Sequence, residues 1–160
     1  MKKNLLVSTL VCALGIFSIA QNNFAQARNT QATKSFTLAD IQGKQVALAD
    51  FKDRPVLLFF WTTWCPHCRM ALKGLEERKD EMKKSGVEVL LIDVGEELGY
   101  INKFVKKNNI TYPVLLDTTS SVALSYDVIG VPTFVLMNKS GEVVFTAHNF
   151  PAGYVELISK

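Results

Sequence analysis

An apolar run stands directly ahead of a C-x-x-C motif in Val56-Leu57-Leu58-Phe59-Phe60-Trp61-Thr62-Thr63-Trp64-Cys65-Pro66-His67-Cys68. Six apolar residues in succession predict a β-strand that is buried on both faces, because a strand with one wet face would alternate apolar and polar residues. Pro66 suits the first turn of a helix, and apolar residues at helical spacing predict that this helix runs over residues 66–84. The stretch therefore predicts a buried strand that leads directly into a helix, with Cys65 at the junction.

Outward from this stretch, strands and helices alternate along the chain. The predicted elements are a hairpin or leading strand at 35–51, strands at 87–94 and 112–117, helices at 96–109, 120–126 and 153–159, and two final strands at 133–137 and 142–146. Strands that alternate with helices imply a mostly parallel sheet flanked by helices, and the final pair adds an antiparallel hairpin. The predicted fold class is therefore α/β, in one domain over residues 35–160.

The composition excludes several classes of protein. Hydrophobic residues make up 48% of the 160 residues and charged residues 21%, as in ordinary globular proteins. The formal net charge of +3 is too small to favour a nucleic-acid partner. Three cysteines are too few for a framework of disulfides. We therefore expect a globular protein that binds no nucleic acid. We also predict a monomer without a metal or a cofactor.

The first residues have the pattern of an export signal. Lys2 and Lys3 precede an apolar run over residues 5–20, and Ala25-Gln26-Ala27 has the small residues that signal peptidase requires. We expect residues 1–27 to be a cleaved signal peptide. An uncleaved membrane anchor is the alternative, although the run is short for a helix that spans a bilayer.

Cleavage at this point changes the properties of the chain. The two lysines are lost without any acid, so the formal charge falls from +3 to +1, and a polar leader at residues 28–34 remains ahead of the domain. Cys12 is also lost, which leaves Cys65 and Cys68. A single C-x-x-C in an exported protein enters a compartment where disulfides persist. We expect the protein in the periplasm or at the outer face of the cytoplasmic membrane, with membrane contact only if the N-terminal segment is retained.

Cys65-Pro66-His67-Cys68 carries the predicted chemistry. A cysteine at the start of a helix faces unpaired N–H groups and the positive end of the helix dipole, which favour the thiolate. We therefore assign Cys65 as the nucleophile, and Cys68, one turn further into the helix, as the resolving residue. Pro66 and His67 are predicted to tune the reduction potential, because one stiffens the first turn and the other can stabilise the Cys65 thiolate.

Gly130-Val131-Pro132-Thr133, just before a predicted strand, is the second feature. A proline at the start of a strand is compatible with a cis peptide bond. It also leaves backbone groups near Val131 free to pair with an extended substrate. A proline that merely begins a strand is the alternative.

These residues together resemble the thioredoxin superfamily, and most closely its exported TlpA/ResA-like thiol-disulfide oxidoreductases. The likeness covers residues 35–154 and includes Phe36-Thr37-Leu38-Ala39-Asp40, Tyr112-Pro113-Val114-Leu115-Leu116-Asp117, Tyr126-Asp127-Val128-Ile129-Gly130-Val131-Pro132-Thr133-Phe134 and Lys139-Ser140-Gly141-Glu142-Val143-Val144. The resemblance implies a thioredoxin-like fold with an N-terminal hairpin and a central αβ insertion. It implies a cis Val131–Pro132 bond that faces the disulfide, and substrate binding by Trp64, Val131 and Pro132. The implied partners are protein thiols or disulfides and an exported or membrane-bound redox donor or acceptor.

Two positions depart from the families that the chain resembles. Thioredoxins carry a buried aspartate six residues before the first cysteine, where this chain has Phe59. ResA-like proteins carry a glutamate three residues after the second cysteine, where this chain has Ala71. Cys68 therefore lacks the general base that either carboxylate would provide, and His67 or water is left to handle the proton.

The direction of the reaction stays open in the sequence. The overall resemblance favours a reductant of exported protein disulfides, as in cytochrome c maturation. The tetrapeptide Cys-Pro-His-Cys is similar to that of DsbA-type oxidants and favours the opposite direction. We interpret the chain as a TlpA/ResA-like reductase, with the oxidant as the first alternative.

Two further functions have weaker support. A thiol peroxidase would use Thr62 together with Cys65, but it also needs a late arginine, and the last arginine is Arg78. A copper-carrying module would use both thiolates of the C-x-x-C and His148. Outside that alternative, we expect His148 to be a surface or packing residue.

Overall fold

The computed structural model describes residues 34–159. The predicted signal peptide at residues 1–27, and nearly all of the predicted leader at 28–34, lie outside the described residues. Within the part that is described, no helix is both long enough and apolar enough to cross a membrane.

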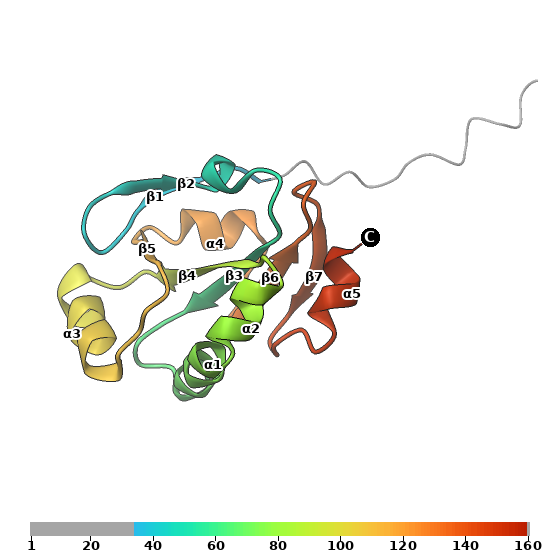
Figure 1. The fold of residues 1–160 in the computed structure, drawn as a ribbon. Coiled ribbons are helices and arrows are strands. Elements are labelled where there is room, and N and C mark those ends of the chain that lie inside the picture. The colour runs from blue at the N-terminus through green and yellow to red at the C-terminus, as the bar shows by residue number, and fades with distance from the viewer. Residues whose placement is uncertain (1–33, 160) are drawn as a thin grey trace, which may run out of the picture. The chain divides into compact units, whose positions relative to one another are not determined.

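The described chain forms a two-stranded hairpin and five further strands, most of them separated by helices (Figure 1). The strands are β1 (Thr37–Ala39), β2 (Gln45–Ala47), β3 (Val56–Trp61), β4 (Glu88–Val94), β5 (Val114–Asp117), β6 (Thr133–Met137) and β7 (Val143–Ala147). The helices are α1 (Pro66–Glu77), α2 (Lys79–Lys84), α3 (Leu98–Asn108), α4 (Ser121–Ser125) and α5 (Tyr154–Ile158), with a 3-10 helix, η1, at Leu48–Phe51. The predicted order of strands and helices, including both hairpins, is confirmed, except that two helices stand where the sequence predicts one over residues 66–84.

β3 is the central strand of a mixed sheet with the order β5-β4-β3-β6-β7. β3 is parallel to β4 and β4 to β5, whereas β6 is antiparallel to both β3 and β7. All strands of this sheet except β6 therefore run in one direction, which confirms the mostly parallel sheet. The register places Trp61 beside Asp93 of β4, and Phe60 beside Thr133 of β6. The carboxyl end of β3 thus lies between the carboxyl end of β4 and the start of β6.

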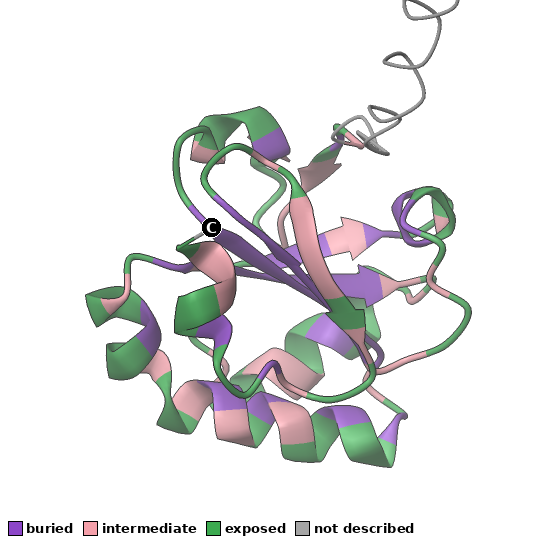
Figure 2. Ribbon diagram, turned by 90° about the vertical axis from the view of Figure 1, so that its right-hand side faces the viewer, coloured by how far each residue is buried: buried purple, intermediate pink, exposed green. Residues whose placement is uncertain are grey.

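The residues of β3 alternate between two apolar layers. Leu57, Phe59 and Trp61 enter the layer that includes residues of α1, α2, α3 and α5. Leu58 and Phe60 enter the layer that includes residues of α4, η1 and the N-terminal segment. Every residue of β3 is buried, and Figure 2 shows the buried strands in purple between helices whose outer faces are exposed. The predicted strand with two buried faces is therefore confirmed.

The prediction of one helix over residues 66–84 is wrong, because the helix breaks at Arg78 into α1 and α2. Arg78 has φ −97° and ψ 9°, and its N–H bonds to the carbonyl of Leu75 rather than continuing the α-helical pattern. Beyond the break, Met82 of α2 is buried in the core, while the Arg78 guanidinium lies 5.2 Å from the centre of the Phe150 ring. No glycine or proline stands at this point, so the sequence carries no local signal for the break.

Candidate active site

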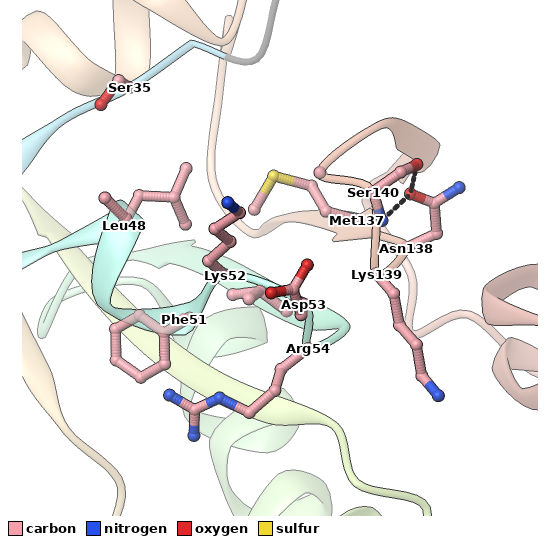
Figure 3. A pocket seen from close by; sticks show the side chains of 13 residues that line it. Ser35, Leu48, Phe51, Lys52, Asp53, Arg54, Met137, Asn138, Lys139 and Ser140 are labelled. Carbon is pink, nitrogen blue, oxygen red and sulfur yellow. Dashed lines mark hydrogen bonds between the residues drawn. The ribbon is translucent and has the colours of Figure 1, made fainter.

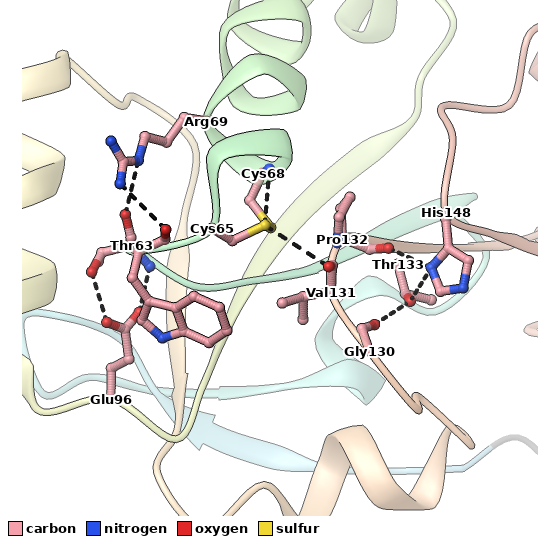
Figure 4. The surroundings of a disulfide bond; sticks show 11 residues. Thr63, Cys65, Cys68, Arg69, Glu96, Gly130, Val131, Pro132, Thr133 and His148 are labelled. Carbon is pink, nitrogen blue, oxygen red and sulfur yellow. Dashed lines mark hydrogen bonds between the residues drawn. A yellow bond between two sulfur atoms is a disulfide. The ribbon is translucent and has the colours of Figure 1, made fainter.

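Cys65 stands between β3 and α1, as the sequence predicts. It is the N-cap residue of α1, and Pro66 occupies the first turn. The backbone N–H of Cys68 points at the Cys65 Sγ atom from 3.1 Å (Figure 4). Cys65 and Cys68 form a disulfide, with their Cα atoms 5.2 Å apart. An N–H donor and a helix N-terminus at this sulfur stabilise a thiolate once the disulfide is reduced.

The two sulfurs differ in their access to solvent. Cys65 is 4% exposed, whereas Cys68 is fully buried in the layer shared with α1. Pro66 and His67, which separate them, are exposed, and the side chain of Trp64 is exposed as well. A reacting thiolate from another protein therefore meets Cys65 first.

The loop at residues 130–133 lies beside the cysteines. The Val131–Pro132 peptide bond is cis, as the resemblance implies. The carbonyl oxygen of Val131 lies 3.8 Å from the Cys65 Sγ atom (Figure 4). A disulfide sulfur has no proton to donate, so this is a close approach of sulfur and oxygen that a reduced thiol can convert into a hydrogen bond.

Two residues that sequence reasoning missed hold the segment just before Cys65. The Glu96 carboxylate accepts hydrogen bonds from the N–H and the hydroxyl of Thr63, at 2.5 and 2.7 Å. From α1, the Arg69 guanidinium donates to the carbonyls of Thr63 and Trp64, at 3.1 and 3.3 Å. Figure 4 shows both side chains around Thr63. Glu96 follows β4, so knowledge that β3 and β4 are parallel neighbours would have pointed to it.

Asp93 is a buried acid at the carboxyl end of β4. It is 1% exposed and lies next to Glu96. Burial, reinforced by the nearby Glu96 carboxylate, raises the pKa of Asp93 to about 8. The neutral acid can donate a hydrogen bond to Glu96, which in turn holds Thr63. A single acid within the apolar run of β4 is visible in the sequence, but the sequence analysis did not single it out.

The positions where related families carry a carboxylate are apolar here. Phe59 is fully buried, and its ring centre lies 4.5 Å from that of Phe134. Ala71 is half-buried and packs against the core layer that contains Cys68. Neither side chain can accept a proton from Cys68, so the departure noted in the sequence is present in the folded protein.

His148 follows β7 and also contacts the loop at residues 130–133. Its Nδ1 atom lies 2.7 Å from the Pro132 carbonyl oxygen and 3.3 Å from the Thr133 hydroxyl (Figure 4). The side chain is exposed, as expected, but the expectation of a surface or packing residue missed these bonds. Between residues 34 and 159, no three His, Cys, Asp or Glu side chains gather in a way that could hold a metal ion.

A surface pocket of about 310 Å³ lies at the opposite end of β3 (Figure 3). Its lining includes Val56 at the start of β3, Met137 at the end of β6, and the cationic side chains of Lys52 and Arg54. Arg54 is already paired with Glu88, at 2.5 Å. None of the predicted site residues lines this pocket, so the C-x-x-C junction remains the candidate active site.

A model of the AhpC/TSA family matches residues 30–146, which is most of the chain. The chain belongs to the AhpC/TSA family. Thiol-disulfide oxidoreductase ResA of Bacillus subtilis (strain 168) is 36% identical over 138 residues, which cover 84% of this chain and 76% of that protein. A second ResA, from Bacillus thuringiensis subsp. konkukian, is 31% identical over 90% of this chain and 88% of its own length.

A solved structure of a related protein has a similar fold. A putative thiol:disulfide interchange protein DsbE from Chlorobium tepidum has a TM-score of 0.69 at 25% identity, over 79% of this chain and 89% of that chain. These likenesses confirm the α/β thioredoxin-like fold and the ResA-like function. This protein is an enzyme, a ResA/DsbE-like thiol-disulfide oxidoreductase with the Cys65–Cys68 pair as its active site.

The buried acid gives a prediction for stability against pH. The pKa of Asp93 is raised from 3.8 to about 8 in the folded protein, so the folded state holds a proton that the unfolded state releases between these values. The free energy of unfolding therefore falls as pH rises from about 4 to 8. Asp93→Asn removes this penalty and should stabilise the oxidised protein by up to about 4 kcal/mol at pH 7.

Urea unfolding of the wild type and Asp93→Asn at pH 4.5 and pH 8 measures this difference. The gain should be small at pH 4.5 and large at pH 8. Asp53→Asn, which changes an exposed acid, is the matched control and should show no such trend. A gain that is equal at both pH values would show that Asp93 is not the group that titrates.

Proposed function

We propose that this protein reduces disulfides in other exported proteins, with Cys65 as the nucleophile and Cys68 as the resolving residue. The observation that carries the proposal is the position of Cys65 as the N-cap of α1, with the Cys68 N–H at its sulfur, in a chain that resembles ResA over most of its length. This position stabilises the thiolate that must attack. The greater burial of Cys68 supports its assignment to the second step.

The proposed reaction moves two electrons in two exchanges. The Cys65 thiolate attacks one sulfur of the substrate disulfide and forms a mixed disulfide, while the other substrate sulfur leaves as a thiolate and takes up a proton. Cys68 then loses its proton and attacks the Cys65 sulfur, which releases the second substrate thiolate. The substrate ends as a dithiol and the enzyme as the Cys65–Cys68 disulfide. An exported or membrane-bound dithiol partner must return the two electrons.

Substrate binding in this proposal uses the surface around Cys65. Trp64 is 66% exposed next to the nucleophile and offers an aromatic face to an incoming chain. Val131 and Pro132 lie across from Cys65, where their backbone can lie beside an extended segment of substrate. This arrangement supports a protein substrate in preference to a small disulfide.

Export and the biological role belong to the same proposal. The basic start, the apolar run and Ala25-Gln26-Ala27 support export, with residues 1–27 either cleaved or retained as an anchor. A secreted disulfide oxidoreductase of Mycobacterium tuberculosis, homologous to DsbE of E. coli, shares the fold at 24% identity and a TM-score of 0.66, over 78% of this chain and 94% of that chain. The TlpA/ResA-like resemblance supports a role in cytochrome c maturation.

The opposite direction, oxidation of substrate thiols, is the second candidate, and His67 is the observation that favours it. This exposed side chain stands between the two cysteines. A hydrogen bond or positive charge from His67 stabilises the Cys65 thiolate, and a more stable reduced form makes a stronger oxidant. The reduction potential of the wild type, together with the redox state of the pair in the cell, decides between the two directions.

Cys68→Ser should trap substrates on Cys65. The first exchange still proceeds, but the serine cannot resolve the mixed disulfide, so covalent adducts accumulate. Non-reducing gels of the exported fraction should show adducts that dithiothreitol releases. Cys65→Ser is the matched control and should trap nothing. If Cys68→Ser forms no adducts where the wild type is active, the assignment of the two cysteines is wrong.

His67→Pro should lower the reduction potential. The substitution removes the imidazole and its stabilisation of the thiolate, at a helical position that tolerates proline. Each 1.4 kcal/mol of lost stabilisation shifts the potential by about 30 mV. Equilibration of the purified protein with glutathione buffers measures the shift. An unchanged potential would show that His67 does not tune the pair.

A further inference from the structure

The loop at residues 130–133 has few bonds of its own. Among the described residues, no backbone–backbone hydrogen bond involves residues 129–132. Ile129, which leads into the loop, is 95% exposed. The shape of the loop next to Cys65 therefore depends on side chains that bind its carbonyl groups.

Each carbonyl of the loop has a defined neighbour. The Thr133 hydroxyl donates to the Gly130 carbonyl at 2.7 Å, and His148 Nδ1 lies 2.7 Å from the Pro132 carbonyl. The Val131 carbonyl, between them, faces the Cys65 sulfur at 3.8 Å. Figure 4 shows the carbonyls of Val131 and Pro132 directed to opposite sides, one to the cysteine and the other to the imidazole.

The chemistry of these partners fixes the role of the imidazole. A carbonyl oxygen can only accept, so His148 must carry a proton on Nδ1 and donate it to Pro132. The Thr133 hydroxyl gives its proton to Gly130, so the lone pairs of its oxygen are available to the same Nδ1–H at 3.3 Å. Both the neutral Nδ1–H tautomer and the imidazolium supply this donor.

The register of the final hairpin explains why His148 reaches the loop. Phe134 of β6 pairs with Ala147 of β7. Thr133, the first residue of β6, and His148, the residue after β7, therefore lie next to each other at this end of the hairpin. The imidazole lies on the side of the loop away from Cys65 (Figure 4), where it can determine the position of the Val131 backbone.

We propose that His148 is a positioning residue for substrate docking: its Nδ1–H bond to the Pro132 carbonyl holds the Val131 backbone where an extended polypeptide substrate lies beside Cys65. The inference rests on the proposed function, because it assumes that substrates are disulfides within polypeptides. A substrate with no backbone to pair gains little from an ordered loop. The loss of the bond should therefore affect peptide disulfides more than small ones.

Kinetics with two disulfides test the proposal. One substrate is a disulfide-linked peptide with several residues on each side of the cysteine, the other is a small aromatic disulfide, and dithiothreitol regenerates the reduced enzyme. His148→Ala should raise KM for the peptide about fivefold, the effect of one lost hydrogen bond, with a smaller change for the aromatic disulfide. His148→Asn should restore the peptide KM, because its side-chain amide can donate from nearly the same place as Nδ1.

A control separates this role from a general effect on folding. Asn149→Ala, a neighbouring exposed position, should keep the wild-type KM.

The position of the proton on the His148 ring can be measured in the wild type, so this test does not depend on whether a variant folds. The ¹⁵N spectrum of the neutral His148 ring should show the proton on Nδ1, and a proton on Nε2 would overturn the proposal. Equal KM for His148→Ala and the wild type, an equal rise for both disulfides, or a failure of His148→Asn to rescue would also overturn it. If the wild type itself does not reduce the peptide disulfide, the proposed function fails instead.

Discussion

β3 is buried at the centre of the sheet, and its place there sets the arrangement of the active site. Because β3 pairs with β4 on one side and β6 on the other, its carboxyl end has two fixed neighbours. Glu96, after β4, holds Thr63 on one flank, and the Val131 carbonyl, before β6, faces Cys65 on the other. The helix that begins at Pro66 then directs the Cys68 N–H at the sulfur. One apolar strand therefore places Cys65 between Glu96, which holds the segment before it, and the loop at residues 130–133.

The sequence was sufficient for the elements and for the reactive pair, because both depend on local patterns. Six apolar residues followed by Cys-Pro-His-Cys identify a buried strand and a helix start without any knowledge of their partners. The sequence did not reveal the roles of Arg69, Glu96 and His148. Each of these side chains forms hydrogen bonds with backbone groups of the site, and these groups come within reach only in the folded chain. The break at Arg78 was also missed, since the apolar spacing continues on both sides of it.

Asp93 shows how the core and the active site are linked. This buried acid opposes folding as the pH rises above about 4, because its ionised form is excluded from the core. The same acid neighbours Glu96, whose carboxylate holds the segment just before Cys65. Although Phe59 and Ala71 carry no carboxylate, the site therefore still has a buried acid nearby. This acid stands on the adjacent strand, β4, on the side of Thr63.

The bond between His148 and Pro132 makes completion of the active site depend on the last hairpin of the fold. The reactive cysteines stand about eighty residues before His148 in the chain, and β7 must pair with β6 before the imidazole reaches the loop. A chain that has formed α1 but not this hairpin carries both cysteines next to an unsupported loop. Its capacity to select polypeptide substrates is therefore acquired with the last strand.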